Sequence, residues 1–307
     1  MTTSAIHGNL YAKLTGSWGR TAVITVPMLF LLTVFLLPFL VVFKISLSEM
    51  DTVFFKDILT WADGVITLQL RLGNYYSLLE DSLYIQTYLV SIKFAAITTA
   101  ICLLIAYPFA YFMARSPADK RPALLMLVML PFWTSFLLRV YAWKMLLADS
   151  GVFNNAAMAM GLISEPVKMM NTPFSLVLGM VYTYVPFMIL PLYANLVKMD
   201  LRLLEAALDL GATPWQAFWR ITVPLSKSGI IAGSMLVFIP CVGEFVIPEL
   251  LGGPQTLMIG RVLWDEFFSN NDWPMAATVA VVMVLLIIVP LALFNKYQAE
   301  STAGGRA

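Results

Sequence analysis

Residues Thr21–Phe43 read TAVITVPMLFLLTVFLLPFLVVF, and this stretch decides the class of fold. It holds 23 residues without a charge, bounded by Arg20 and Lys44. At a rise of about 1.5 Å per residue, a helix of this length reaches across the roughly 30 Å hydrocarbon core of a bilayer. The stretch is longer than the apolar part of a signal peptide, and no small-residue cleavage site follows it. We therefore expect a retained transmembrane helix.

The composition extends this conclusion to the whole chain of 307 residues. Hydrophobic residues make up 60% of the chain, charged residues make up 12%, and the mean hydropathy is +0.82. Soluble proteins are about 45–50% apolar and about 25% charged, so a soluble protein of this length could not bury so much apolar surface. The same figures exclude a disordered chain, a coiled coil and a disulfide scaffold. A polytopic membrane protein remains.

Five further apolar stretches, separated by charged segments, predict an all-α polytopic membrane protein with six transmembrane helices. The expected spans are residues 21–46, 87–114, 123–147, 173–197, 228–250 and 274–295. Together they form one transmembrane domain over residues 21–297, with tails at residues 1–20 and 298–307.

The distribution of lysine and arginine predicts the orientation of these spans. With the N-terminus in the cytoplasm, the inner segments carry 11 cationic residues, and the outer loops carry 4, namely Lys56, Arg71, Lys168 and Arg261. The opposite orientation would place the excess outside, so we expect both termini in the cytoplasm. The outer loops are rich in acidic residues, which would attract cations.

Several kinds of functional site are excluded by what the sequence lacks. The net charge of +1 provides no basic field for nucleic acid. Cys102 and Cys241 lie in separate apolar stretches and predict packing residues rather than a disulfide or a metal pair. His7 is the single histidine, so neither a histidine-based metal site nor a Ser-His-Asp triad is expected. We expect no catalytic residue, no metal and no cofactor in this chain.

The loop at residues 199–226, between the fourth and fifth spans, predicts a helix followed by a tight turn. Asp200 can cap a helix that begins at Leu201, because a short acidic side chain accepts from the free backbone N–H groups of the first turn. Gly211 is suited to end that helix, since glycine adopts the left-handed conformation that follows a helix C-terminus.

A second helix is expected directly after the turn. Thr213 can cap it, with Pro214 at the first helical position and Gln216 completing a capping box. Pro224 is expected to end it, and Ser226 is expected to cap the fifth span. The sequence thus predicts a helix–turn–helix on the cytoplasmic face.

This helix–turn–helix exposes more apolar surface than a solvated loop needs. Such surface predicts either a protein partner or contact with lipid headgroups, and the periodicity alone favours neither. The apolar residues concerned are Leu201, Leu204, Leu208, Trp215, Phe218 and Trp219.

The middle of this loop resembles the EAA signature of ABC-importer permeases. Glu205-Ala206-Ala207 is followed after three residues by Gly211 and after nine more by Ile221-x-Val-Pro224. Val223 stands where that family usually has Leu, which exchanges one apolar residue for another. In that family the loop is a coupling helix that inserts into a groove of the ATPase subunit. The resemblance implies that ATPase coupling involves Glu205, Ala206, Ala207, Asp209, Gly211, Pro214, Ile221 and Pro224.

Four longer stretches, at residues 35–50, 131–143, 233–253 and 258–268, resemble the permeases of bacterial polyamine importers, most closely the putrescine-type subunit. The resemblance implies a type I importer permease fold in the bacterial inner membrane, with a five-helix core and one N-terminal helix. It also implies three partners: an ABC ATPase dimer, a second homologous permease and a periplasmic polyamine-binding protein.

The chain contains no Gly-x-x-x-x-Gly-Lys-[Ser/Thr] sequence, so it lacks the phosphate-binding loop that ATP hydrolysis requires. ATP and magnesium would be used by the partner ATPase. We therefore expect a non-enzymatic permease subunit that imports a polyamine by alternating access, with putrescine as the favoured cargo. Spermidine or another small cargo is the alternative. An ion-coupled secondary transporter is disfavoured because no internal repeat is visible, and an intramembrane enzyme because no catalytic motif is present.

A path for a polycation requires carboxylates and aromatic rings, and the fifth span supplies two carboxylates. A charge in mid-membrane costs roughly 2.5–3.5 kcal/mol on insertion scales, so such residues are candidates for function. Glu244, expected toward the outer side, either binds cargo or pairs with Arg139 at similar depth. Glu249 is expected near the outer mouth, where a loop carboxylate or a contact to the binding protein is favoured over cargo contact. Pro240 and Pro248 are expected to break the helix locally.

The aromatic candidates for stacking on the cargo lie in the third and fourth spans. Trp133 and Tyr184 are expected to lie deepest and are the better candidates, and Tyr141 is a further one. For most aromatic residues here, helix packing or an interfacial belt is the simpler explanation.

Overall fold

The computed structural model describes residues 17–50, 59–62, 65–68 and 71–304, and these are almost entirely helical. The all-α class is confirmed for this part of the chain. The chain divides into two compact units, which we describe separately. Unit 1 comprises Met1–Tyr76 and Asp272–Val281, and unit 2 comprises Ser77–Asn271 and Val282–Ala307.

Unit 1 is built on one long apolar helical run that covers the first predicted span. A π-helical turn, η1, joins α2 to α3 without a break, and large side chains along the run, such as Phe30 and Phe35, are exposed. Where α3 ends, Thr278 Oγ1 of α16 donates to the Ser46 carbonyl at 3.2 Å. The elements are α2 (Ser17–Leu31), η1 (Leu32–Leu36), α3 (Leu37–Ser46), β1 (Leu59–Ala62), β2 (Val65–Leu68), α4 (Gly73–Glu80) and the first part of α16 (Trp273–Gly304), with β1 and β2 pairing antiparallel.

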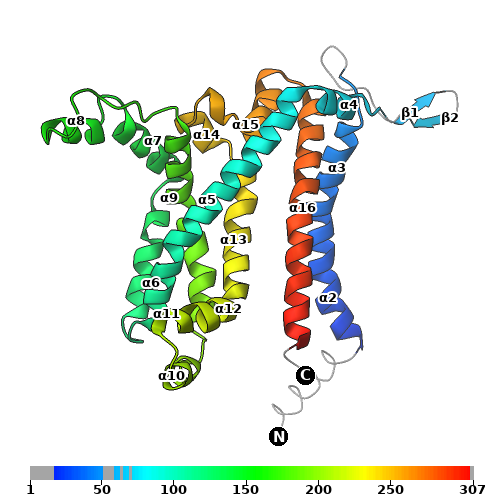
Figure 1. The fold of residues 1–307 in the computed structure, drawn as a ribbon. Helices are drawn as coiled ribbons and strands as arrows, with labels where there is room; N and C mark the ends of the chain where they lie inside the picture. The colour runs from blue at the N-terminus through cyan, green and yellow to red at the C-terminus, as the bar shows by residue number, and fades with distance from the viewer. Residues whose placement is uncertain (1–16, 51–58, 63–64, 69–70, 305–307) are drawn as a thin grey trace, which may run out of the picture. The chain divides into compact units, whose positions relative to one another are not determined.

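Unit 2 is built around three helices that pack side by side, α5, α9 and α13 (Figure 1). Its elements are α5 (Ser82–Arg115), α6 (Arg121–Met129), η2 (Leu130–Trp133), α7 (Phe136–Leu147), α8 (Val152–Ala159), α9 (Pro173–Leu196), α10 (Arg202–Asp209), α11 (Pro214–Ala217), η3 (Phe218–Thr222), α12 (Val223–Leu225), α13 (Lys227–Val242), α14 (Val246–Leu251), η4 (Pro254–Thr256), α15 (Ile259–Trp264) and η5 (Asp265–Ser269). The α10–α12 segment lies at one end of this bundle, and α14 and α15 lie at the other (Figure 1).

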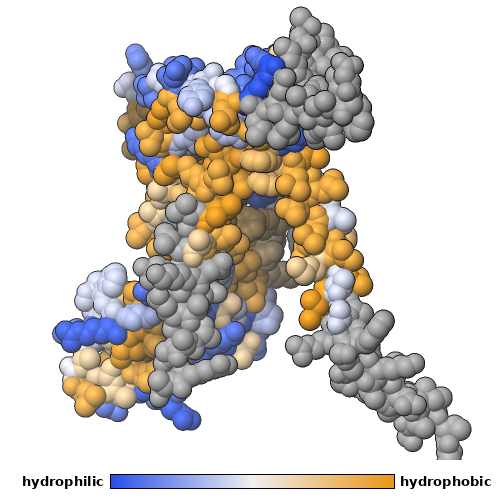
Figure 2. All heavy atoms as spheres, turned by 90° about the vertical axis from the view of Figure 1, so that its right-hand side faces the viewer, coloured by the Kyte–Doolittle hydropathy of each residue, from blue (hydrophilic) through white to orange (hydrophobic). Residues whose placement is uncertain are grey.

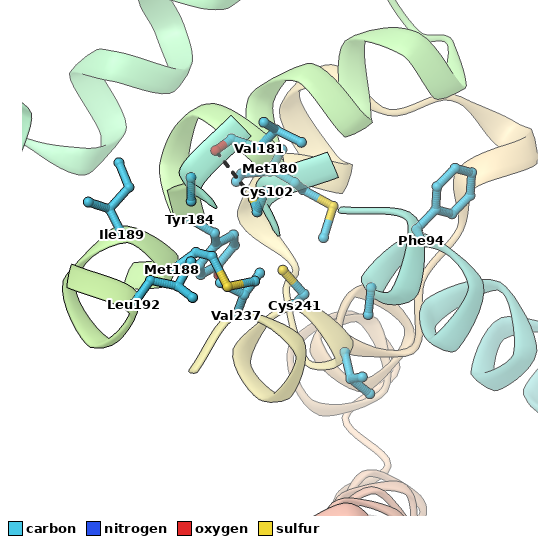
Figure 3. Packing of buried hydrophobic residues seen from close by; sticks show 14 of the residues in the cluster. Phe94, Cys102, Met180, Val181, Tyr184, Met188, Ile189, Leu192, Val237 and Cys241 are labelled. Carbon is cyan, nitrogen blue, oxygen red and sulfur yellow. Dashed lines mark hydrogen bonds between the residues drawn. The ribbon is translucent and has the colours of Figure 1, made fainter. Parts of the chain in front are cut away.

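The core of unit 2 is a dry cluster of aliphatic and sulfur-containing side chains. Cys102 of α5, Met180 and Met188 of α9, and Val237 and Cys241 of α13 are completely buried (Figure 3). Both cysteines are free thiols in this cluster, so their predicted role as packing residues is confirmed.

Glycines let α9 approach its neighbours closely. A Cβ atom at Gly233 of α13 would lie 2.7 Å from the sulfur of Met188, and one at Gly179 of α9 would lie 2.5 Å from Cδ1 of Leu251. Each short contact is with the far end of a flexible side chain, so a larger residue at either position would force Met188 or Leu251 to shift, and glycine lets them pack without that shift.

The third predicted span, residues 123–147, is broken rather than continuous. The helical piece Arg121–Trp133 ends in a 3₁₀ turn, and the backbone is extended at Thr134 before α7 begins. The two pieces, Arg121–Trp133 and Phe136–Ala159, meet at 83°. Pro131 cannot donate a backbone hydrogen bond, which weakens the helix just before the break.

The fifth predicted span, residues 228–250, ends earlier than expected. Helix α13 stops at Val242, and the chain turns before α14 begins at Val246. The predicted local break of this span is present, and it lies between Pro240 and Pro248 rather than at either proline. Pro240 lies inside α13, and Pro248 lies in the first turn of α14, where a backbone N–H has no partner within the helix anyway.

The described residues give three to five candidate membrane spans, where the sequence predicts six. Three helices are long and apolar enough to cross a membrane alone: Val23–Ser46, Ser82–Arg115 and Pro173–Leu196. Two bent helix pairs raise the number to five, and Trp273–Ile288 is a shorter apolar helix. In Figure 2 hydrophobic side chains cover the flanks of the helices in view, and hydrophilic ones gather toward the helix ends.

Candidate functional site

The helix–turn–helix predicted for residues 199–226 is present at one end of unit 2. The Asp200 carboxylate accepts from the Arg202 backbone N–H at 3.0 Å, so α10 begins one residue later than expected. Gly211 adopts a φ of 85°, and its N–H donates to the Leu208 carbonyl at 2.9 Å. The next N–H donates back to the Ala207 carbonyl at 3.0 Å, which completes a Schellman motif.

The capping box at the start of the second helix is also confirmed. Thr213 Oγ1 accepts from the Gln216 N–H at 3.3 Å, and Gln216 Oε1 accepts from the Thr213 N–H at 3.0 Å. Pro214 stands at the first helical position, where its missing N–H costs nothing. These bonds fix the angle at which the second helix leaves the turn.

The second helix ends one residue later than predicted. It runs past Pro224 through α12 to Leu225, and α13 follows at an angle of 64°. Before the proline lies the π-helical turn η3, where the Val223 N–H bonds to the Phe218 carbonyl five residues back. The wider turn changes the backbone pairing ahead of the proline and accommodates its ring. Ser226 does not cap α13 with its side chain, because its hydroxyl bonds to the Val223 carbonyl and to Tyr107.

Helix α10 carries the EAA residues and has no buried side chain. Glu205 and Asp209 are exposed, and Leu210 at its end is 89% exposed. A short helix with both ends capped and several leucines in solvent does not stabilise the core of its own chain. Such a helix suits contact with another molecule.

The aromatic residues of the second helix divide into two groups. Phe218 packs edge-on against Tyr107 of α5, with ring centroids 5.5 Å apart, so it anchors the loop to the bundle. Trp215 and Trp219 remain 68% and 53% exposed. They line an apolar groove of about 500 Å³ between this helix and α5. The sequence left open whether the apolar surface of this loop contacts a protein partner or lipid headgroups. Phe218 is used within the chain, so this question now concerns Trp215, Trp219 and the leucines of α10.

At the opposite end of unit 2, Glu244 lies in the turn between α13 and α14. Its Oε1 accepts from the backbone N–H of Val246 at 3.1 Å and of Ile247 at 3.5 Å, so the carboxylate caps α14. Its Oε2 accepts a hydrogen bond from the phenol of Tyr184 on α9. The structure thus brings together two of the residues expected on the cargo path.

Arg139, the alternative partner of Glu244, is engaged elsewhere. Its guanidinium lies over the ring of Phe132, 5.4 Å from the centroid, and its buried Nε has no hydrogen-bond partner. Within the described part of the chain, Glu244 forms no ion pair with a lysine or arginine. The carboxylate is therefore held by neutral donors alone.

The remaining residues predicted on the path lie apart from this pair. Trp133 is 76% exposed at the break between α6 and α7, and Tyr141 is 48% exposed on α7, so neither side chain lies in the core of unit 2. Glu249 forms an ion pair with Arg261 of α15, with 2.6 Å between Oε2 and Nε. The contact supports an ordinary structural role for Glu249.

An aromatic stack beside Glu244 was not singled out from the sequence. Phe245 stacks on Trp264 of α15, with centroids 4.5 Å apart and planes at 10°, and Phe268 follows at 4.1 Å from Trp264. The spacing of Trp264 and Phe268, four residues apart on one helix face, is the sequence pattern that could have predicted this stack. A second tyrosine–carboxylate pair joins α5 to η5, where the Tyr84 phenol donates to the Glu266 carboxylate at 2.7 Å.

Among the described residues, no group of three or more His, Cys, Asp or Glu side chains could hold a metal ion. Unit 2 presents instead a capped, exposed helix, α10, at one end of its bundle and a partly accessible carboxylate, Glu244, near the other end.

Comparison with protein families gives one match that spans most of the chain. The model for the binding-protein-dependent transport system inner membrane component matches residues 20–299. Similar proteins agree with this family match. The chain is 40% identical over 279 residues to the spermidine/putrescine transport system permease protein PotB of Haemophilus influenzae, covering 90% of this chain and 93% of that protein. It is 42% identical over 228 residues to PotB of Escherichia coli K12, covering 73% of this chain and 82% of that protein.

Comparison with solved structures supports the fold. The chain resembles a subunit of a bacterial ABC transporter involved in the import of the acidic polysaccharide alginate, with a TM-score of 0.65 and 18% sequence identity. The match covers 95% of this chain and 99% of that chain. At this identity the likeness concerns the fold alone.

Proposed function

Because the chain belongs to the family of binding-protein-dependent transport system inner membrane components, we propose that it is the subunit through which a polyamine crosses the membrane in an ATP-driven importer. The chain is a multi-pass permease of the inner membrane and not a catalytic subunit. ATP and magnesium belong to a partner ATPase, and cargo reaches the permease from a periplasmic binding protein.

The observation that carries this proposal is α10. It holds Glu205-Ala206-Ala207, buries none of its side chains and ends in a Schellman motif at Gly211. A helix fixed at both ends transmits a push more directly than a flexible loop, because it moves as a rigid piece. We assign the ATPase contact to its exposed face, with Glu205 and Asp209 as the polar contacts.

The cargo assignment rests on the relatives and on chemistry. The two PotB proteins are described as permeases for spermidine and putrescine. Glu244 is an acceptor with no cationic partner in the described chain, as a path for ammonium groups requires. We propose putrescine as the preferred cargo and spermidine as the alternative.

The topology that suits this role has six spans, with both termini and α10 in the cytoplasm. The lysine and arginine distribution supports it. In this topology the bent pair Arg121–Trp133 and Phe136–Ala159 is one span, α13 is the next span after the cytoplasmic helix Pro214–Leu225, and the apolar helix Trp273–Ile288 of α16 is the sixth. A second homologous permease would complete the path, since a five-helix core on one side of a pore leaves the other side open.

The proposal is tested by uptake into proteoliposomes that contain the complete complex, with its binding protein outside and ATP inside. Labelled putrescine should accumulate only with ATP, and an excess of unlabelled spermidine should show whether the two compete. Accumulation that persists without ATP and stops with an ionophore would assign the chain to ion-coupled transport instead.

A further inference from the structure

We infer that Tyr184 is a positioning residue, which fastens helix α14 to α9 through Glu244, and that a cargo ammonium group releases α14 by taking the place of the phenol. This inference rests on the proposed function, because it requires a cargo with an amine. In this role Tyr184 acts on the cargo path through the carboxylate and does not itself hold the cargo.

Helix α14 is fastened to α9 at both ends. At its C-terminal end, Ser175 Oγ of α9 donates to the Leu251 carbonyl at 2.7 Å. At its N-terminal end, Tyr184 donates to the Glu244 side chain, which in turn holds the first N–H groups of α14. Between the two ends, Gly179 allows the side chains of Ile247 and Leu251 to lie directly against α9.

The two fastenings differ in accessibility. Ser175 and Leu251 are both completely buried, and their bond ends on a backbone carbonyl. Glu244 is only partly buried, and its partner bond ends on a charged side chain. The Ser175 end is therefore the fixed end of α14, and the Glu244 end is the one that a solute can reach.

The chemistry of the accessible end favours exchange by an ammonium group. The carboxylate receives three hydrogen bonds, from one phenol and two backbone amides, and all three donors are neutral. An ammonium group adds a full positive charge to its hydrogen bond with the carboxylate, so it gains a Coulombic attraction that the phenol and the amides lack. The amide donors belong to α14 itself and move with it, so the phenol is the donor that is displaced.

The turn next to Glu244 would follow this movement. A Cβ atom at Gly260 of α15 would lie 2.5 Å from the Gly243 carbonyl oxygen and 2.7 Å from the Glu244 carbonyl oxygen, so α15 rests directly on the turn. Phe245 stacks on Trp264 of the same helix. A displaced turn therefore carries α15 with it, and the region opens as one piece.

The native thiol of Cys241 reports on this region. Cys241 is completely buried, and its carbonyl accepts from the Glu244 N–H at 3.4 Å. With Cys102→Ala removing the other cysteine, the rate of maleimide labelling in the complete complex measures how often the turn opens. Tyr182→Phe, which removes a hydroxyl two residues from Tyr184 on the same helix, is the matched control.

We expect Tyr184→Phe to raise the labelling rate of Cys241 about two- to tenfold without cargo, the range that one hydrogen bond supports. Saturating putrescine should raise the rate of the parent protein to a similar level and leave that of Tyr184→Phe unchanged. Tyr182→Phe should behave as the parent. A Tyr184→Phe protein that labels at the parent rate and still responds to putrescine would overturn the inference.

The two proposals fail separately. If the parent complex takes up putrescine while its labelling ignores both putrescine and Tyr184→Phe, the fastening is wrong and the function stands. If Tyr184→Phe raises the labelling rate of Cys241, but putrescine neither raises that rate in the parent complex nor is taken up, then Tyr184 fastens α14 and the cargo assignment is wrong.

Discussion

The phenol of Tyr184 on α9 donates a hydrogen bond to the carboxylate of Glu244, which lies 60 residues later at the start of α14. The same carboxylate caps α14 through the N–H groups of Val246 and Ile247. One acidic side chain thus joins two helices that the chain separates by the whole α10–α13 segment. The negative charge is satisfied by neutral donors, which leaves it able to attract a cation.

Replacement of Glu244 by glutamine tests the charge apart from the cap. The amide oxygen of Glu244→Gln can still accept from Val246, so α14 should keep its N-terminal bond. The charge-assisted bond to an ammonium group is lost, and we expect putrescine uptake at limiting cargo to fall about tenfold. Uptake by the reconstituted complex measures this, with protein recovery in the membrane as the check on folding. Unchanged uptake would remove Glu244 from the path.

Replacement of Glu205 by alanine tests the docking role of α10. Glu205 is exposed, and its loss should not disturb the packing of this chain, whereas its contact with the ATPase would be removed. We expect uptake to be abolished while the protein still inserts in the membrane. Glu165→Ala, which also removes an exposed carboxylate, is the control and should transport normally. Normal uptake by Glu205→Ala would show that the docking assignment is wrong.

The turn at Gly211 provides a test of the same role through the backbone. Its φ of 85° is closed to proline, whose ring holds φ near −65°, and proline would also lose the N–H that bonds to Leu208. Gly211→Pro should therefore abolish uptake. Asparagine tolerates positive φ, so Gly211→Asn should retain most of it. Equal uptake by the two variants would mean that the turn does not matter for coupling.

The sequence predicted the α10 region in detail because its signals are local. Asp200, Gly211 and the pair Thr213 and Gln216 form their bonds within a few residues, so spacing alone specifies them. The π-helical turn before Pro224 had no such local signal, and Phe218 within it packs against Tyr107 of α5, a contact between distant parts of the chain.

For the region around Glu244, the sequence identified candidate residues but not the contacts between them. Depth along a straight helix placed Glu244 level with Arg139, but α13 ends at Val242 and α6 breaks from α7, so the equal depths do not apply. The hydrogen bonds that replace that ion pair join α9 to α14, which no periodicity brings together. Tertiary packing decides such contacts, and a single sequence does not carry it.

Glu249 is predicted to be dispensable for transport. Its ion pair with Arg261 is half-exposed, with 50% and 34% of the two side chains in solvent, and exposed pairs contribute about 0–1 kcal/mol. We expect Glu249→Gln to transport putrescine within about twofold of the parent, because a loss of this size changes an equilibrium only a few-fold. Uptake at limiting cargo is the measurement. A loss as large as that of Glu244→Gln would place Glu249 on the path as well.

Gly260 of α15 is predicted not to tolerate a larger side chain. The added Cβ of Gly260→Ala would meet two backbone carbonyl oxygens at 2.5 and 2.7 Å, and backbone atoms cannot move aside as a flexible side chain can. Overpacking of this kind costs typically about 1–3 kcal/mol, so the melting temperature of the detergent-purified protein should fall. Gly73→Ala is the matched control, because nothing lies within 4 Å of the added atom and the substitution should leave the melting temperature unchanged. The displaced turn carries Glu244 with it, so Gly260→Ala should also transport less putrescine per inserted protein than Gly73→Ala does. Equal melting temperatures for the two variants would mean that α15 does not rest on the Gly243–Glu244 turn.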